Sequence, residues 1–449
     1  MRQIRLNAFD MNCVGHIQQG LWTHPRDQAV NYNSLDHWTG LARLLERGLF
    51  DGLFLADVLG VYDVFGGSPD AAICHGVQVP VGDPMMLVSA MAAATTHLGF
   101  GVTANLSYEP PYVFARRMST LDHLTRGRIG WNVVTGYLDS AARAMGFTQQ
   151  VAHDDRYDVA DDTMQALYKL WEGSWADDAV KADRSAGLYA DPARVRSVRH
   201  DGPYVRLEGV HLAEPSPQRT PVLYQAGSSE RGRLFAGQHA ECVFLNGGPK
   251  PGVAAHVAAI RAAAQASGRA PTDVLAFVGA SVVVAETEAL AQAKLADYRR
   301  YASAEAGLVH ASASMGIDLA AYGMDQPIEA VPTQAIASNL AAMAQQGMTK
   351  RKLMDRMVLG SRQVPIVGNP AQVADALLAW VDEADVDGFI LSRTVTPECF
   401  EDFIELVVPE LQRRGAFKEA YAPGTLRGKL FGHGRLGDTH PAARERWWV

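Results

Sequence analysis

The chain has 449 residues, of which 48% are hydrophobic and 20% are charged, so it can bury a large core and has the composition of a globular enzyme. The formal net charge is −8 and no block of lysine and arginine occurs, which argues against nucleic acid or an anionic membrane surface as a partner. The N-terminus lacks a signal-peptide pattern, no apolar run of about 18 residues occurs, and the four cysteines are scattered, so we expect a cytoplasmic protein without a membrane span, a disulfide framework or a zinc site.

Short apolar runs alternate with amphipathic stretches along the whole chain. The runs are rich in Val, Ile, Leu or Phe and lack a clean polar alternation, which is typical of parallel strands buried on both faces. They predict strands at residues 4–9, 52–56, 98–104, 128–134, 221–226, 242–247, 274–285 and 388–393. The amphipathic stretches predict helices at residues 35–48, 84–95, 112–124, 155–172, 229–239, 252–267, 286–301, 370–384 and 399–413.

Eight strands that alternate with helices predict a (β/α)8 TIM barrel, formed by a single domain over residues 1–449. A doubly wound open sheet is the alternative. Two long insertions interrupt the alternation: residues 173–220 contain many turn formers and a hairpin-like YVRLEG, and residues 302–366 are rich in Ala, Ser, Met and Gly. Insertions of this length often act as lids or contact surfaces, and 302–366 is our candidate lid. The tail, 416–449, is expected to pack along the surface or on a neighbour.

The most informative segment is RRMSTLDHLTRGRIGWNVVTGY, residues 116–137. Its pattern predicts a helix, a turn and a buried strand that stops at Thr135, Gly136 and Tyr137. An apolar strand that ends in polar and small residues is how a (β/α) barrel presents chemistry at its C-terminal mouth.

The motif GSSERG, residues 227–232, follows a predicted strand and opens a helix. Gly227 permits a tight turn, and Ser228 and Ser229 add hydroxyl donors to the free N–H groups of the helix start, where the helix dipole favours an anion. The motif therefore indicates a phosphate site. Serine is also a common helix cap, so a capped helix without a ligand remains the simpler alternative.

The motif HDDRYD, residues 153–158, precedes a long helical pattern. His153 and Tyr157 are four residues apart and would share one face of a helix, from which both can donate hydrogen bonds to a phosphate. The alternative is a capping region with Asp154 or Asp155 at the N-cap and a packed tyrosine.

Polar side chains also follow the first two predicted strands, Cys13 and His16 after one and Asp57 and Tyr62 after the other. Together at one rim they could bind a polar ring or move protons. A buried apolar thiol and a structural histidine would explain the first two equally well, whereas a carboxylate directly after GLFLA needs a partner if it is buried. No HExxH or HxxxH spacing occurs, so a metal is not expected.

The sequence GFGVTA, residues 99–104, matches the dinucleotide pattern GxGxxA. Its glycines fall inside a predicted strand, and Glu109-Pro110-Pro111 precedes the next helix. Because the dinucleotide fingerprint requires a strand, then the glycines, then a helix, we reject nicotinamide binding at this position. No Walker-type loop or nucleophile elbow occurs either.

Taken together, these motifs resemble the flavin-dependent, luciferase-like monooxygenases, in the branch that includes the nitrilotriacetate, dibenzothiophene sulfone and long-chain alkane enzymes. The resemblance covers almost the whole chain and is carried by LFLADVLGVYD, RRMSTLDHLTRGRIGWNVVT, HDDRYDVAD, YKLWEGSW and EPSPQRTPVLYQAGSSERG. It is greatest toward the long-chain alkane type. The resemblance implies a (β/α)8 barrel that uses reduced FMN and O2.

Position by position, the resemblance implies two sets of site residues. The implied FMN contacts are Asp57 near the isoalloxazine ring, Thr103 and Gly136, and a phosphate group held by His153, Tyr157, Ser228 and Ser229. The implied polar pocket, which supplies the candidate catalytic groups, consists of Cys13, His16, Tyr62, Gln78 and His310.

The chain departs from the alkane type just past the WNVVT strand. Tyr137 stands where that type has a histidine, and Gly136 replaces a serine. The phosphate motifs are kept while part of the substrate side has changed, so FMN use is better supported than an alkane substrate. We add Tyr137 to the candidate catalytic residues, with His16 or Tyr137 as the proton donor and His310 acting only after the insertion closes.

We therefore expect an FMN-dependent monooxygenase that acts on a small apolar or aromatic molecule. A riboflavin lyase is also known in this branch, so cleavage of a flavin or another heterocycle is an alternative. A flavin-binding protein without turnover and a deazaflavin-dependent oxidoreductase on the same barrel are the others. The resemblance further implies a separate NAD(P)H-dependent flavin reductase as the source of reduced FMN, and a homodimer or homotetramer.

Overall fold

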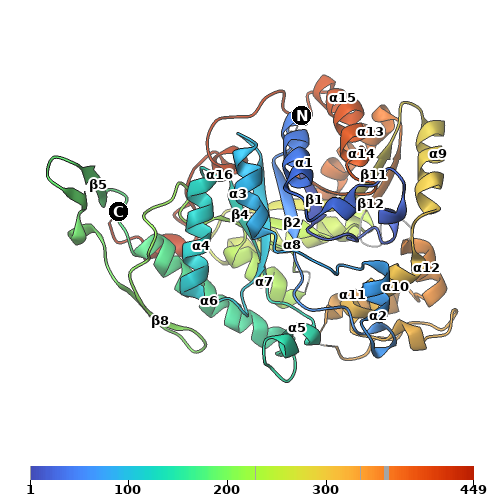
Figure 1. Cartoon of the computed structure of the whole chain (residues 1–449), viewed down its shortest axis with the longest axis horizontal. Helices are drawn as coiled ribbons and strands as arrows, with labels where there is room; N and C mark the ends of the chain where they lie inside the picture. The colour runs from blue at the N-terminus through green and yellow to red at the C-terminus, as the bar shows by residue number, and fades with distance from the viewer. Residues whose placement is uncertain (1, 228, 334, 358–363, 449) are drawn as a thin grey trace.

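In the computed structural model, which describes residues 2–227, 229–333, 335–357 and 364–448, eight parallel strands form a closed barrel (Figure 1). Around the barrel they are β1 (Arg5–Met11), β2 (Gly52–Ala56), β3 (Gly99–Asn105), β4 (Ile129–Val134), β9 (Val222–Gln225), β10 (Cys242–Leu245), β11 (Leu275–Val284) and β13 (Gly388–Ser392). The pairings of β10 with β11 and of β13 with β1 close the ring. The predicted (β/α)8 barrel is confirmed, and the alternative of an open sheet is wrong.

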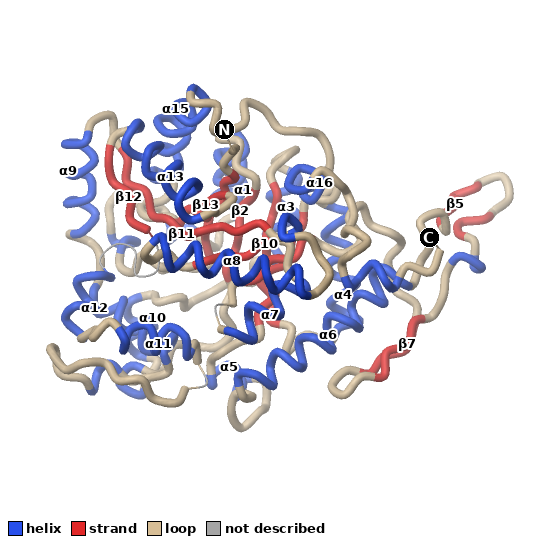
Figure 2. Tube along the Cα trace, turned by 180° about the vertical axis from the view of Figure 1, so that it is seen from behind, coloured by secondary structure: helices blue, strands red, loops and turns tan. Residues whose placement is uncertain are grey.

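Helices surround the barrel on its outer face, and the main apolar core lies between them and the strands (Figure 2). They are α1 (Leu35–Arg47), α3 (Met85–Ala93), α4 (Pro111–Leu124), α6 (His153–Gly173), α7 (Glu230–His239), α8 (Lys250–Ala266), α9 (Glu288–Arg299), α13 (Pro370–Ala384), α14 (Glu398–Asp402) and α15 (Val408–Arg413), with a π-helical turn, η7 (Phe403–Val407), between the last two. Two short helices, α2 (Asp70–His75) and α5 (Asp139–Ala144), lie instead beside the second insertion and share a separate apolar cluster with it. Short 3-10 turns are η1 (Leu21–Thr23), η2 (Ala29–Asn31), η3 (Phe65–Gly67), η4 (Pro192–Arg194), η5 (Pro271–Asp273), η6 (Leu319–Ala321) and η8 (Pro441–Glu445).

A further strand, β12 (Val364–Gly368), lies beside the C-terminal half of β11 and was not predicted. The predicted insertion 302–366 therefore runs three residues into a strand. The run is short and contains Pro365, which has no backbone N–H to donate, so its sequence does not have the pattern of a strand. Because β11 has ten residues, it can pair with β10, with β13 and then with β12 along its length.

Glycines inside the strands make room for the aromatic rings that fill the barrel. A Cβ atom on Gly101 of β3 would lie 2.7 Å from the ring of Phe54, and one on Gly130 of β4 would lie 2.3 Å from the ring of Tyr224. The GFGVTA glycines thus belong to a buried strand, as predicted, and serve packing rather than a phosphate turn.

The first insertion forms two antiparallel hairpins, β5 (Val180–Asp183) with β6 (Leu188–Ala190) and β7 (Val198–Asp201) with β8 (Arg206–Gly209). The predicted hairpin at YVRLEG corresponds to β7 and β8. Figure 1 shows β5 and β8 at one end of the molecule, away from the barrel. The tail reaches the same end, where the Trp447 indole donates to the carbonyl of Gly173 at 2.8 Å, so the tail packs on its own chain.

The second insertion carries α10 (Ala304–Met315), α11 (Ala337–Gln345) and α12 (Lys350–Met357), which share a small apolar core of their own. Helix α10 also packs against α2, and Figure 1 shows both near α5. The expected action of this insertion as a lid stays a prediction.

The end of the barrel at which the strands begin is closed by α16 (Leu426–Phe431). Leu426 and Leu430 join the apolar cluster of the barrel interior. Arg427 is fully buried and pairs with Glu241 through both carboxylate oxygens, at 2.6 and 2.9 Å. The opposite end, where the strands stop, remains free to form a site.

Candidate active site

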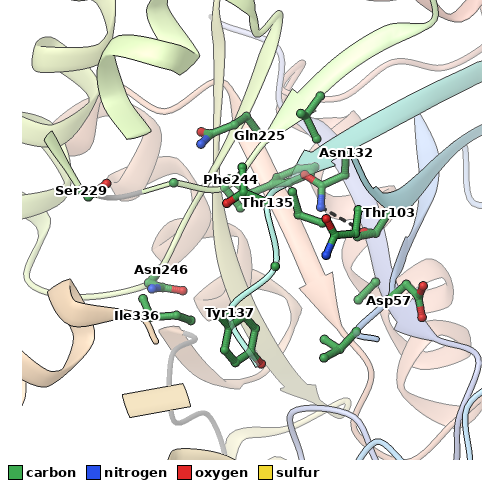
Figure 3. A pocket seen from close by; sticks show the side chains of 18 of the residues that line it. Asp57, Thr103, Asn132, Thr135, Tyr137, Gln225, Ser229, Phe244, Asn246 and Ile336 are labelled. Carbon is green, nitrogen blue, oxygen red and sulfur yellow. Dashed lines mark hydrogen bonds between the residues drawn. The ribbon is translucent and has the colours of Figure 1, made fainter. Parts of the chain in front are cut away.

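A cavity of about 670 Å³ lies at the C-terminal ends of the barrel strands. Its polar residues follow one strand after another: Asp57 comes after β2, Thr103 lies on β3, Thr135 follows β4, Gln225 ends β9 and Asn246 follows β10 (Figure 3). Such convergence at the strand ends is where (β/α)8 enzymes place their active sites, and the volume suits a cofactor together with a small molecule.

Most residues singled out in the sequence line this one cavity. They are His16, Asp57, Tyr62, Gln78, Thr103, Gly136, Tyr137, His153, Tyr157, Ser229 and His310. Ser228 lies outside the described residues, so its predicted phosphate contact has no structural counterpart here.

Cys13 is the exception among the described candidates, because it is not one of the lining residues. Its side chain is fully buried and its thiol donates to the carbonyl of Gly15 at 3.3 Å. Burial raises the pKa of the thiol to about 12, so it is neutral and unreactive as a nucleophile. The predicted pocket role of the thiol therefore has no support from its position.

Tyr157 lies at one end of the cavity, where His153, Arg231 and Ser229 surround it. It projects from α6 one helical turn after His153, the first residue of that helix, whose ring packs edge-on against it at 5.4 Å, as their spacing predicted. The Arg231 guanidinium lies 5.6 Å from the ring. Burial raises the pKa of the Tyr157 hydroxyl, while its hydrogen bonds with Ser229 and Gln225 and the nearby arginines act in the opposite direction.

Ser229 caps the start of α7 at the same end, accepting the N–H of Gly232 at 3.0 Å. Gly227 precedes it, and a Cβ atom there would lie 2.1 Å from the Gln225 amide nitrogen and 2.7 Å from the Tyr157 hydroxyl. Only glycine fits between these groups. A helix start, hydroxyl groups and an arginine together form a surface that favours a phosphate.

Asp57 marks the other side of the cavity. Burial, reinforced by the nearby Asp83 carboxylate, raises the pKa of Asp57 to about 7, against the hydrogen bond from the Val58 N–H. A carboxyl group of this kind changes its charge near neutral pH, which is typical of a functional site.

Asn132 on β4 lies opposite Thr103 on β3 and donates to its hydroxyl at 3.0 Å, as Figure 3 shows. The Oδ1 atom of Asn132 and the Oε1 atom of Gln225 are buried, and neither has a hydrogen-bond partner among the described residues. Unpartnered buried amide oxygens cost free energy unless a ligand with N–H or O–H groups satisfies them. Apolar side chains complete this part of the lining: Phe9, Phe54, Phe244 and Ile390.

Four predicted pocket residues form a connected corner. The Tyr62 hydroxyl donates to the Gln78 amide oxygen, and the Tyr137 hydroxyl lies 2.9 Å from that of Tyr62. Because Tyr62 has a single hydroxyl proton and gives it to Gln78, Tyr137 is the donor in the second bond. The ring of His310, from α10, stacks on the Tyr62 ring at 5.6 Å. The second insertion thus supplies one wall of the cavity.

His16 is buried in the wall beside the Phe9 ring, whose centre lies 4.5 Å away. Burial lowers the pKa of its imidazole well below the usual range, and the positive charge of Arg393 and the neighbouring His310 lower it further. His16 is therefore neutral at physiological pH. Its Nδ1 atom has no partner among the described residues.

The sequence analysis missed several lining residues, among them Asn132, Gln225, Asn246, Arg156 and Arg231. Asn132 and Gln225 had a visible signal, since each is a polar residue inside an otherwise apolar strand. The arginines had none, because a charged residue on an amphipathic helix is more often exposed to solvent.

Comparisons with known proteins agree with this geometry. The family model for luciferase-like monooxygenases matches residues 10–387. The chain belongs to this family. The sequence is 49% identical to the long-chain alkane monooxygenase of Geobacillus thermodenitrificans (strain NG80-2), over 99% of this chain and 98% of that one. It is 46% identical to the dimethyl-sulfide monooxygenase of Hyphomicrobium sulfonivorans, over 99% of this chain and 94% of that one.

Solved structures of family members superpose over nearly the whole chain. The crystal structure of long-chain alkane monooxygenase gives a TM-score of 0.91 at 48% identity, with 99% of this chain and 100% of that one covered. A riboflavin lyase structure, with a modified FMN and the substrate riboflavin, gives 0.94 at 41% identity with the same coverage. This chain is thus an oxidoreductase, and its relatives indicate that it is a flavin-dependent monooxygenase.

Proposed function

We propose that this luciferase-like monooxygenase is the oxygenating component of a two-component enzyme that uses reduced FMN and O2 on an uncharged, mostly apolar or aromatic small molecule. Reduced FMN supplies the two electrons with which one oxygen atom of O2 enters the substrate while the other leaves as water. The observation that carries the proposal is one cavity that joins a phosphate-favouring end to buried, unpartnered amide oxygens.

The residues present fit FMN. At the phosphate end, the cap of Ser229, the Tyr157 hydroxyl and His153 would hold the phosphate, with Arg231 nearby. Because the phosphate carries charge, hydrogen bonds to it are among the stronger ones.

At the ring end, Asn132 offers an acceptor to the N–H groups of a flavin, and Asp57 and Thr103 lie on the same side. Gln225, which bonds to Tyr157, offers a second acceptor nearer the phosphate end. Gly136 has a positive φ of 71°, and a Cβ atom there would lie 2.4 Å from the Asn105 amide nitrogen. A side chain at this position would therefore collide with the Asn105 amide.

The nature of the substrate follows from the charges along the lining. Among the described lining residues the arginines are Arg156 and Arg231, and no lysine occurs. Both arginines lie beside Tyr157 at the phosphate end. The corner of Tyr62, Gln78 and Tyr137 presents hydroxyl and amide groups instead. A polycarboxylate would find no arginine or lysine in that corner among the described residues, whereas a neutral molecule with an apolar body suits the site.

The chain's own residues would handle the proton and exclude water. His16, kept neutral, can hold or pass a proton at its unpartnered Nδ1 atom, and Tyr137 can donate its hydroxyl proton once it releases the bond to Tyr62. The apolar lining residues Val58, Leu234 and Ile336 would keep solvent from the reacting atoms, which limits side reactions.

Riboflavin-lyase-type cleavage is the second candidate. It is supported by the match to the riboflavin lyase structure, which is as extensive as the match to the alkane enzyme. The cavity would then hold a second flavin in place of an apolar molecule.

Two further parts of the proposal concern partners. A separate NAD(P)H-dependent flavin reductase would deliver reduced FMN, since the sequence has no nucleotide loop of its own for NAD(P)H. We also propose that the chain acts as a homodimer or homotetramer.

The proposal is tested by mixing the protein with chemically reduced FMN and isotopically labelled O2 in the presence of an alkane, a dialkyl sulfide, an aromatic sulfone or riboflavin. We expect the mass of one organic product to rise by one labelled oxygen atom. Consumption of riboflavin with loss of its side chain would support the lyase instead. If FMN binds but no substrate raises oxygen uptake above the background, the protein is a flavin carrier and the proposal is wrong.

A further inference from the structure

His16 lies on a short segment, residues 12–17, that follows β1 and is held from two sides. On one side, the carbonyl of Gly15 accepts the N–H of Gln78 at 3.0 Å, and isolated bridges join Cys13 to Val81 and Gly15 to Val77. The same contact places Gln78 against the stretch of backbone that carries His16. On the other side, the segment rests on a buried arginine that follows β13.

That arginine is Arg393, which is 3% exposed. One of its terminal nitrogens, Nη2, donates to the carbonyl of Cys13 at 2.9 Å and to the carbonyl of Val14 at 2.7 Å. Its Nε atom lies 3.1 Å from Oδ1 of Asp10, which is completely buried on β1. The guanidinium group therefore bridges a carboxylate on the barrel and the backbone that leads directly to His16.

We propose that the buried Asp10–Arg393 pair is a positioning device for His16: it fixes the backbone that carries the imidazole, so that the ring is held toward the cavity. The catalytic part of this inference rests on the proposed oxygenation, whereas the state of the His16 ring does not. Cys13 then contributes through its backbone carbonyl rather than through its thiol.

The charges around both groups agree with this assignment. Burial is the main cause of the lowered pKa of His16, and the nearby Arg393 and His310 lower it further. The carboxylates that act on Arg393 are those of Asp10 and Asp27. No other arginine or lysine acts on His16 within the described residues.

A second buried pair provides the matched control. Arg427 and Glu241 also form an arginine–carboxylate pair with additional bonds to backbone carbonyls, those of Thr220 and Pro221. This pair closes the opposite end of the barrel. The pair and the two residues whose carbonyls it contacts are all absent from the lining of the cavity. If buried pairs serve only to hold the fold together, damage to either pair should have the same effect.

The experiment compares Arg393→Met, Arg393→Lys and Arg427→Met in the full chain labelled with 15N-histidine, with His16→Asn used to assign the His16 signal. We expect the His16 signals in a pH titration to be the same in the wild type and in Arg427→Met, and to differ in Arg393→Met, because the backbone that carries the ring is no longer held there. We expect kcat to fall about ten- to hundredfold in Arg393→Met, because a slightly misplaced group can cost that much. FMN affinity should change less than about threefold, since its phosphate is held at the other end of the cavity.

Arg393→Lys keeps the charge but cannot make the forked contacts, so its kcat should fall by an intermediate factor. Should Arg393→Met fail to fold, Asp10→Asn and its match Glu241→Gln decide the question: kcat should fall at least about tenfold in the first and not in the second. The inference is overturned if variants of the two pairs with equal losses of Tm have equal kcat, or if the His16 titration in Arg393→Met is the same as in the wild type. If the wild type does not oxygenate any substrate, the proposed function fails, and the His16 titration alone still tests the role of the pair.

Discussion

The side-chain amide of Asn132 on β4 donates a hydrogen bond to the hydroxyl of Thr103 on β3, and its Oδ1 atom is buried without a partner among the described residues. The Thr103 contact fixes the amide orientation, so the oxygen is the atom left for a ligand. Replacement of Asn132 by Leu should weaken FMN binding about tenfold, the value of one well-placed hydrogen bond. Fluorescence titration with FMN measures this. Thr103→Val, which removes only the orienting contact, should have a smaller effect, and an equal affinity for Asn132→Leu and the wild type would contradict the assignment.

Tyr157 offers a test of the phosphate end. The Tyr157→Phe variant keeps the ring that packs against His153 and loses the hydroxyl. We expect FMN affinity to fall about tenfold while the affinity for riboflavin, which has no phosphate, stays unchanged. Parallel titrations with the two flavins measure the difference. A parallel loss for both flavins would show that Tyr157 contacts the ring system or only supports the fold.

Asp57 should make stability depend on pH. Its pKa is raised from 3.8 to about 7, so the folded state holds the proton more tightly than the unfolded chain. The contribution to stability is fully present below the unfolded value and is lost as the pH rises through about 7. We therefore expect the Tm of the wild type to fall, relative to that of Asp57→Asn, between about pH 5 and about pH 8. Thermal melts of both proteins across this range check the prediction, and a constant Tm difference would refute it.

Arg427 should matter for the fold and not for the site. Arg427→Met removes a fully buried cation and leaves the Glu241 carboxylate uncompensated, which typically costs about 3–5 kcal/mol. Urea unfolding of the apoprotein measures the change in the free energy of unfolding. FMN affinity of the folded fraction should match that of the wild type, and a weakened affinity would indicate that the closed end of the barrel communicates with the cavity.

The barrel itself could be predicted from the sequence because its strands are buried on both faces and separated by amphipathic helices. β12 could not, since it is only five residues long, contains Pro365, and pairs only with the far half of β11. A strand that depends on a single long neighbour has no signal of its own in the local pattern.

The site was predictable where a motif leads directly out of a strand, as at Asp57, Tyr137 and Ser229. It was not predictable where function depends on an encounter between distant segments. The contact of Tyr62 with Tyr137 joins residues that are 75 positions apart, and nothing in either motif indicates the other. Cys13 shows the converse, because its place beside His16 in the sequence suggested a shared role, while its thiol bonds to the local backbone instead.

The barrel's base is completed by a helix that comes late in the chain. During synthesis, every strand has already been made when Leu426, Arg427 and Leu430 leave the ribosome, and until then the interior rings and the Glu241 carboxylate have no cover on that side. A nascent or truncated chain that stops before residue 426 therefore exposes the apolar interior of the barrel and leaves the Glu241 carboxylate without its arginine. Folding of this helix is then the event that converts an aggregation-prone intermediate into a closed barrel.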